Sequence, residues 1–464
     1  MKRFLTPFAF LLVFLAGCDS FSLNEADPAP AVKESIGIEP GTDPINANQA
    51  ACVALMFDND HGRPATKSGS AISDIYTVYD DEGTAVFYAV NRPDNAGYVI
   101  VGASRKYFPI LAYVEKGNFD DSYTETGIAP WVNEQISTIS MIEKHAESGQ
   151  EEAGELDFEG MWKAYEKKAV LPTMLTKSAK EDDAFSLRQA SVAAWQAEGY
   201  TCYDLMEQPK RLPSAIYDYW RSYAASFANQ NYDPMVYSVI LEKRVETVNT
   251  IGPLIGTTWG QTGGYAAAIP GNRYVGCAPV AVGQIMWYHR WPVTFAWPYM
   301  PANSPNSTTA DFLYTLGKRM NINYNGNSSS ASNGDAEDAL KFYNYSSALG
   351  FYDESIISSN ITVGRPVYIY GEVAQSGHAW VCEGTRDLIS HYGYQMMILS
   401  DVEPPLQYVN WVQPYDAYAG TTTYLYHNLG YLGEGNGWYV GRNIDLKPDT
   451  FEAIGMIYNI SPNK

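Results

Sequence analysis

Cys277 has the surroundings that a catalytic thiol needs. The run 271–276 before it is loop-like, and the run 278–288 after it has the composition of a buried helix. Pro279 suits the first turn of that helix, where its missing N–H costs nothing. A helix N-terminus favours an anion, so the pattern predicts a stabilised thiolate at Cys277 that could attack a carbonyl carbon. From position alone, a buried structural thiol is the alternative and the commoner case.

A thiolate of this kind works with an imidazole base. His378 follows Gly377 and begins an alternating, β-prone run, and the segment 364–371 before it also has a strand pattern. His378 is therefore expected at the start of a strand in a hairpin, where it can face a helix terminus. A purely structural histidine stays open at this point. His289 lies about three turns along the Cys277 helix and is too far away. The remaining histidines are His61, His145, His391 and His427.

Composition and charge exclude several classes of protein. The chain has 464 residues and a formal net charge of -21, which argues against nucleic-acid binding because this needs a basic surface. A hydrophobic content of 46% excludes a wholly disordered chain, and five cysteines are too few for a disulfide-built scaffold. No His/Cys cluster has metal-ligand spacing, so neither a metal nor an organic cofactor is expected. Residues 1–250 hold 21 basic and 36 acidic residues, against 10 and 16 in residues 251–464, which indicates two different kinds of domain.

The first half contains the elements of a small domain. The run 47–57 predicts a short helix. Four β-prone runs separated by turn signals follow it, at 72–79, 85–91, 98–102 and 110–114. Together they predict an antiparallel meander with one helix. Helical patterns then cover 131–168 and stretches around 190–196 and 216–228, without deciding whether residues 145–250 are a linker or a supporting subdomain.

The N-terminus has the pattern of an export signal. Lys2 and Arg3 precede the apolar run 4–16, which is shorter than the roughly 20 residues that span a bilayer. The following Leu-Ala-Gly-Cys, ending at Cys18, resembles the lipobox of bacterial lipoproteins, and this resemblance implies lipidation of Cys18. An ordinary secretory signal with an incidental cysteine is the alternative. The polar, proline-containing run 19–43 is then expected to be a tether.

Four blocks of the second half follow one another in a fixed order. They are Ile251–Gln261, Val275–Tyr288, Gly377–Gly384 (Gly-His-Ala-Trp-Val-Cys-Glu-Gly) and His427–Tyr439. In this order they resemble the streptopain family of papain-like cysteine peptidases, and the fourth is similar to that family's Asn-Trp-Gly-Trp-Gly-Gly block. The meander of the first half, with Ala96–Val101 and Pro109–Tyr113, resembles the family's inhibitory pro-domain.

The resemblance implies an α+β fold. A papain-like catalytic domain with a helical half and an antiparallel β half would follow a small α+β pro-domain. The expected divisions are a lipoprotein signal peptide (1–18), a tether (19–43), an inhibitory pro-domain (44–145), a helical connector of uncertain role (146–247) and the peptidase domain (248–464).

The resemblance also implies roles for four residues. Cys277 would be the nucleophile, His378 the general base and acid, Gln261 the side-chain donor to the oxyanion, and Asn428 the residue that orients the imidazole. From the residues alone, a surface amide at Gln261 and a turn cap at Asn428 stay open. The expected protein is an exported or lipid-anchored endopeptidase of the bacterial cell envelope, made as a latent zymogen. Its partners would be protein or peptide substrates and its own pro-domain.

Several departures from the family pattern keep other functions open. Leu429 stands where the family has the tryptophan that shields the His–Asn contact, and Tyr431 replaces the second tryptophan. The run 263–266 replaces a Pro-Tyr-Asn block, and the 385–424 segment between the third and fourth blocks is long for the family. The alternatives are a catalytically silent surface-binding protein on the same scaffold and a Cys–His acyltransferase or amidase.

Overall fold

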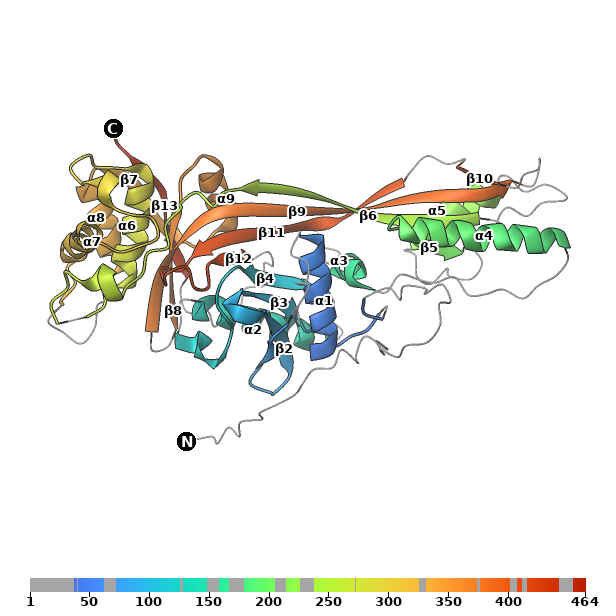
Figure 1. Cartoon of the computed structure of the whole chain (residues 1–464), viewed down its shortest axis with the longest axis horizontal. Coiled ribbons are helices and arrows are strands. Elements are labelled where there is room, and N and C mark those ends of the chain that lie inside the picture. Colours follow the sequence, from blue (N-terminus) through green and yellow to red (C-terminus); the bar gives the residue numbers. More distant parts are fainter. Residues whose placement is uncertain are drawn as a thin grey trace.

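One large sheet runs through the molecule. The computed structural model describes residues 37–39, 41–61, 72–125, 128–147, 158–166, 179–204, 214–225, 238–271, 273–324, 331–373, 376–400, 407–410, 415–441 and 454–464. Within these ranges 13 strands form a single sheet, whose main path runs β1-β2-β3-β4-β12-β11-β9-β8-β13-β7. The molecule is elongated, with α6, α7 and α8 at one end and α4 and α5 at the other (Figure 1). Cys18 and the predicted signal peptide lie outside the described residues.

The first domain has the predicted helix and meander. A capping box formed by Asn46 and Gln49 begins α1, whose buried face includes Val53 and Phe57. The strands pair in order as antiparallel neighbours. The elements are α1 (Ala47–Asp60), β1 (Asp74–Tyr79), β2 (Ala85–Asn91), β3 (Tyr98–Gly102), β4 (Ile110–Val114) and α2 (Ala129–Glu147), with the 3₁₀ turns η1 (Pro93–Asn95) and η2 (Asp121–Glu125). The expectation of one helix and a four-stranded meander is confirmed.

The helical half of the second domain surrounds one buried helix. Every residue of α6 (Cys277–His289) from Ala278 to Met286 is buried, as is typical of a helix that is apolar on all sides. Around it lie α7 (Ser307–Arg319), α8 (Asn333–Phe342), η4 (Gly263–Ala266) and η5 (Trp297–Tyr299). Their apolar side chains, including Trp297 and Leu313, form one core cluster with α6.

The β half supplies the predicted hairpin. β8 (Val367–Val373) pairs with the start of β9 (Ser376–Ser400), and the register places Gly371 opposite His378. The remaining elements of this half are β7 (Tyr345–Phe351), α9 (Glu354–Thr362), β11 (Tyr415–Asn428), β12 (Gly437–Val440) and β13 (Gly455–Pro462). A helical half, an antiparallel β half and a preceding small α+β domain together confirm the predicted α+β class.

A long arm extends away from the second domain (Figure 1). It consists of β9, β11 and β6 (Ser238–Ile251), with β6 paired to β9 along its whole length. Its outer part carries β5 (Thr201–Asp204), β10 (Gln407–Asn410), α4 (Ala179–Ala197) and α5 (Ser214–Ala225). Between residues 146 and 247 the sequence patterns predicted only helices, whereas the structure adds the strand β5 and the start of β6. Within the helical pattern over 131–168, the described residues form α2 as far as Glu147, α3 (Phe158–Trp162) and η3 (Lys163–Tyr165).

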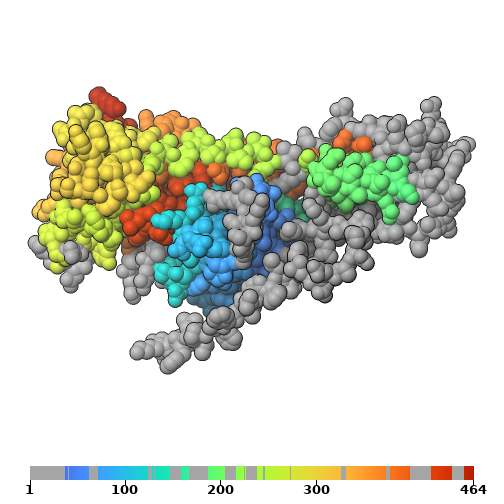
Figure 2. All heavy atoms as spheres, viewed as in Figure 1, coloured from blue at the N-terminus to red at the C-terminus, as the bar shows by residue number. Residues whose placement is uncertain are grey.

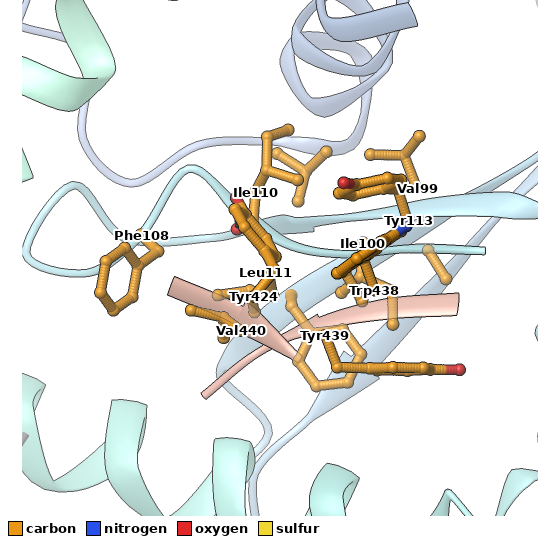
Figure 3. Packing of buried hydrophobic residues seen from close by; sticks show 14 of the residues in the cluster. Val99, Ile100, Phe108, Ile110, Leu111, Tyr113, Tyr424, Trp438, Tyr439 and Val440 are labelled. Atoms are coloured by element: carbon orange, nitrogen blue, oxygen red, sulfur yellow. Dashed lines mark hydrogen bonds between the residues drawn. The ribbon is translucent and has the colours of Figure 1, made fainter. Parts of the chain in front are cut away.

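The two domains share the sheet. β4 of the first domain pairs antiparallel with β12 of the second, with Trp438 opposite Tyr113. Figure 3 shows Tyr113, Ile110 and Leu111 packed close to Trp438 and Tyr439 in one buried cluster. Figure 2 shows the first domain, in blue and cyan, lying directly against the red strands of the second. The first domain is therefore bound by strand addition together with aromatic packing.

No helix in the described part of the chain is both long and apolar enough to cross a membrane.

Candidate active site

Cys277 is the first residue of α6. Gly276 precedes it with a φ of 98°, a conformation that favours glycine, and turns the chain into the helix. Burial raises the pKa of the Cys277 thiol, while the backbone N–H groups of Ala379, Ala278 and Cys277 itself favour the thiolate. Because Ala379 belongs to β9, the thiol lies between a helix N-terminus and the residue after His378. The predicted position of Cys277 at a helix N-terminus is confirmed.

His378 is held in a neutral form. Its Nε2 lies 2.9 Å from the carbonyl oxygen of Leu429, and a carbonyl only accepts, so Nε2 carries the proton. Its Nδ1 then accepts a hydrogen bond of 3.2 Å from the Tyr431 hydroxyl. Burial lowers the pKa of His378 to about 4, and the Leu429 carbonyl opposes this only in part. The imidazole is therefore uncharged near neutral pH.

Tyr431 connects His378 with Gln261. Its ring is stacked on the imidazole, with centroids 4.9 Å apart and an interplanar angle of 17°. Burial raises the pKa of Tyr431 to about 12, the neighbouring Cys277 also raises it, and a hydrogen bond with the Gln261 side chain lowers it. One hydroxyl thus contacts both Gln261 and His378 and lies near Cys277.

Asn428 is the last residue of β11 and is buried. Its Nδ2 donates to the Thr257 carbonyl oxygen at 2.8 Å and to Glu383 Oε1 at 2.9 Å. Glu383 also accepts a short hydrogen bond from the backbone N–H of Ile255. Burial raises the pKa of Glu383 to about 8, although both of these hydrogen bonds lower it. Asn428 therefore belongs to a network that leads to the start of the second domain.

A cleft of about 760 Å³ borders the site region at Gln261, Leu429 and Tyr431. The second domain lines it with Gln261, Tyr431 and Leu432, and the first domain with Tyr98 and Phe119. The first domain thus forms one wall of the cleft beside Gln261. An extended peptide that entered this cleft would meet residues of the first domain.

The structure brings the four predicted residues into one region but does not join all of them. Within the described ranges no hydrogen bond connects Cys277 with His378, and none connects His378 with Asn428. Both imidazole nitrogens are bonded to other groups, the Leu429 carbonyl and the Tyr431 hydroxyl. The Leu429 side chain is 5% exposed, in the position where the family has a tryptophan.

Sequence reasoning missed the contacts of Tyr431 and the role of Glu383 in the network. Tyr431 was visible only as a replacement of a family tryptophan. A usable signal for Glu383 was its place in an alternating, otherwise apolar strand, because a carboxyl group there must be buried beside hydrogen-bond donors.

Two family models, one curated protein and one solved structure match parts of this chain. The Spi protease inhibitor family model matches residues 42–139, and the Peptidase C10 family model matches residues 293–439. The thiol protease/hemagglutinin PrtT of Porphyromonas gingivalis is 21% identical over 386 residues, which cover 74% of this chain and 36% of that relative. A solved fragment of prointerpain A from Prevotella intermedia covers 84% of this chain, and the match covers 99% of that fragment, with 15% identity and a TM-score of 0.45.

The two family matches define a domain of a cysteine peptidase family that follows a domain of an inhibitor family. The chain contains a peptidase C10 (streptopain family) domain, matched over residues 293–439, and an N-terminal domain of the Spi inhibitor type, matched over residues 42–139. The family and the pro-domain predicted from the four blocks and the meander are confirmed. The Peptidase C10 match begins after Cys277, so the roles of individual residues remain predictions.

Proposed function

We propose that the chain is an exported zymogen whose processed form hydrolyses peptide bonds in proteins through Cys277 and His378. The observation that carries this proposal is the position of the Cys277 thiol at the N-terminus of α6, with the N–H of Ala379 beside it and His378 next along β9. A helix N-terminus and these N–H groups favour the thiolate, which is the nucleophilic form.

The reaction requires His378 to move from its present partners to Cys277. The imidazole then takes the thiol proton, and the thiolate attacks the carbonyl carbon of the scissile bond. The Gln261 amide and the Cys277 backbone N–H stabilise the oxyanion. His378 donates its proton to the departing amine and leaves a thioester on Cys277. Water, activated by the same imidazole, hydrolyses the thioester, releases a carboxylic acid and restores the thiol.

The described form supports latency. Burial disfavours both the thiolate of Cys277 and the imidazolium of His378, so the ion pair is not favoured here. The Tyr431 hydroxyl is hydrogen-bonded to the side chains of Gln261 and His378. The first domain forms one wall of the cleft. Removal of the first domain would open the cleft and uncover the edge of β12.

Casein hydrolysis tests the activity. The purified full chain is incubated until it is processed and is then assayed with and without iodoacetamide, beside the variant C277A. We expect cleavage by the wild type, loss of cleavage after alkylation, and a C277A chain that stays full length. A processed wild type that cleaves no protein contradicts the proposal. Transfer of the acyl group to an added amine with no hydrolysis would indicate an acyltransferase.

We further propose that the protein is anchored through lipidated Cys18. The support is the lipobox-like sequence that ends at this residue. Mass spectrometry of the N-terminal peptide from membranes of a bacterial host is expected to show a diacylglyceryl thioether on Cys18. A mature N-terminus beyond residue 18, or Cys18 found in a disulfide, would contradict lipid anchoring and leave the proposed hydrolysis unaffected.

A further inference from the structure

The side-chain amide of Asn428 has one fixed orientation. Its Nδ2 donates to the Thr257 carbonyl at 2.8 Å and to Glu383 Oε1 at 2.9 Å. A backbone carbonyl only accepts, so Nδ2 and not Oδ1 must face Thr257. Both protons of Nδ2 are used, and the opposite side of the amide presents Oδ1.

Asn428 Oδ1 has no hydrogen-bond partner. The residue is 1% exposed, and this oxygen is buried without a donor. A buried acceptor left without a donor is unfavourable and uncommon in folded proteins. His378 Nε2–H, the donor that this oxygen would need, is bonded to the carbonyl of Leu429, the residue next to Asn428. If the imidazole moved toward Asn428, its Nε2–H would exchange the Leu429 carbonyl for Oδ1 of the preceding residue.

Glu383 reaches Asn428 because the strand is irregular at this point. In the pairing of β11 with β9, Tyr426 lies opposite Gly384 and His427 opposite Cys382, so Glu383 is the extra residue of a bulge. A bulge re-aims a side chain and is common beside active sites. The Glu383 carboxyl is 1% exposed and accepts from both Asn428 Nδ2 and the Ile255 N–H.

We propose that Glu383 is a positioning residue for peptide hydrolysis. Its carboxyl holds Nδ2 of Asn428, so that Oδ1 stays directed to accept the Nε2–H of His378 when the imidazole pairs with Cys277. Through the Ile255 N–H, the same carboxyl ties Asn428 to the segment that leads to Gln261. The inference rests on the proposed function, and Glu383 itself touches neither Cys277 nor His378.

The variant E383Q tests this role, with E242Q as the matched control. Glutamine keeps the shape but offers one acceptor to two donors, so Asn428 Nδ2 can lose its second acceptor and Oδ1 is then held in place by the Thr257 bond alone. We expect kcat of the processed enzyme on a peptide substrate to fall about tenfold with KM within about twofold. Glu242 is also a buried carboxyl whose pKa burial raises, but it lies in β6 beside Tyr203, so E242Q should leave kcat unchanged.

A double-mutant cycle separates positioning from a role in folding. In an N428A background, E383Q should change kcat by less than about twofold, because its effect passes through Asn428. An equal loss in both backgrounds, or no loss in either, overturns the proposal. Should E383Q not accumulate as folded protein, E383D, which withdraws the carboxyl by one methylene group, enters the same cycle with the same expectation.

A second readout distinguishes failure of this inference from failure of the proposed function. Alkylation of Cys277 by iodoacetamide at mildly acidic pH reports the thiolate–imidazolium pair without any substrate. We expect E383Q to slow this alkylation several-fold and to have no effect with N428A. Slower alkylation in a chain that cleaves no casein would remove the peptidase but support the positioning of the Cys277–His378 pair by Glu383. Casein cleavage with kcat and alkylation unchanged by E383Q would remove the inference alone.

Discussion

At the scale of single residues, the Tyr431 hydroxyl contacts two groups that hydrolysis would need. Its oxygen is bonded to the Gln261 side chain, and its proton goes to His378 Nδ1. While these bonds hold, the imidazole cannot accept the Cys277 proton and the Gln261 amide is not available to an oxyanion. One side chain that sequence reasoning noted only as a replaced tryptophan thus accounts for much of the inactive geometry.

Removal of this hydroxyl should therefore shorten latency. In Y431F the ring can still stack on His378, but the bonds to Gln261 and Nδ1 are lost. We expect the full chain to begin casein cleavage several-fold sooner, because each lost hydrogen bond contributes about 1 kcal/mol to the inactive arrangement. The time course of activity after purification measures this. The exposed Tyr299 supplies the control Y299F. A lag equal to that of the wild type would show that the hydroxyl does not maintain latency.

The positions of the site residues could be predicted from sequence, but their hydrogen-bond partners could not. Glycine and proline around Cys277 indicate a helix start, and alternation after His378 indicates a strand. Both signals are local. The partners of His378 come from residues about 50 positions away, where a backbone carbonyl and a hydroxyl face the imidazole only through tertiary packing.

At the scale of elements, β12 joins the two domains. Gly437 of β12 lies opposite Val114 of β4. A Cβ at Gly437 would lie 2.7 Å from the Tyr113 carbonyl oxygen and 2.9 Å from the Val114 Cα and Cγ2 atoms. All of these close atoms belong to the first domain. Glycine at this position thus permits the close approach of the first domain.

The variant G437A should weaken the zymogen without harming the processed enzyme. A methyl group there must displace β4, at a cost of about 1–3 kcal/mol in the full chain. We expect a lower melting temperature and faster maturation, but an unchanged kcat/KM once the first domain is gone. The control is G334A in α8, where a Cβ meets only the Ser332 Oγ at 3.7 Å. Equal damage to the processed enzyme would mean that Gly437 serves the second domain itself.

Sequence reasoning identified the elements with strong local patterns and missed β5 and β6. The strand β6 contains Glu242, Lys243 and Arg244, residues that favour helices in isolation. Its strand conformation comes from 14 residues paired with β9, a segment about 150 positions further along the chain. Local propensity is a weak guide where such long-range pairing decides the outcome.

At the scale of the whole molecule, a few long strands connect the site with the outer end of the arm. β9 begins beside the thiol at Ala379 and continues to the outer end of the arm at Ser400. β6 pairs with β9, and the chain continues from the end of β6 to Ile255 and Gln261. Residues 146–247, expected to be a connector of uncertain role, therefore end within β6, a strand of the sheet that supports the site. A disturbance of the sheet near the site can reach the pro-domain, because β11 pairs with both β9 and β12.

His427 lies in β11, the strand that pairs with both β9 and β12, and its protonation would make the sheet sensitive to acid. It is buried in β11, and its Nδ1 accepts a hydrogen bond of 2.9 Å from Trp380 Nε1. A small cavity beside it is lined by Trp131 and Glu134 of the first domain and by Tyr439 of β12. Burial lowers the pKa of His427 to about 3. Protonation would place a charge between the two domains and remove the acceptor of the Trp380 bond.

The sign of the pH effect follows from proton binding. An unfolded histidine has a pKa of about 6.5, so between about pH 6.5 and pH 3 the folded chain binds fewer protons at His427 than the unfolded chain. The contribution of neutral His427 to the free energy of unfolding is fully present above pH 6.5, and about 2 kcal/mol of it is lost by pH 5. Buried carboxyls with raised pKa values, such as Glu383, act in the opposite direction, so the wild-type curve alone does not isolate His427.

The variant H427N isolates it, because asparagine can still accept from Trp380 but does not titrate. We expect H427N to be less stable than the wild type at pH 7.5, where it has lost packing. Between pH 7.5 and pH 5 it should lose about 2 kcal/mol less of its free energy of unfolding than the wild type loses. Urea unfolding of the unprocessed chain, kept intact by the additional change C277A in both proteins, measures the difference. If the free energies of unfolding of H427N and the wild type changed in parallel with pH, His427 would be already protonated, or exposed, in the folded zymogen. The junction of the two domains would then not be the acid-sensitive part of the sheet.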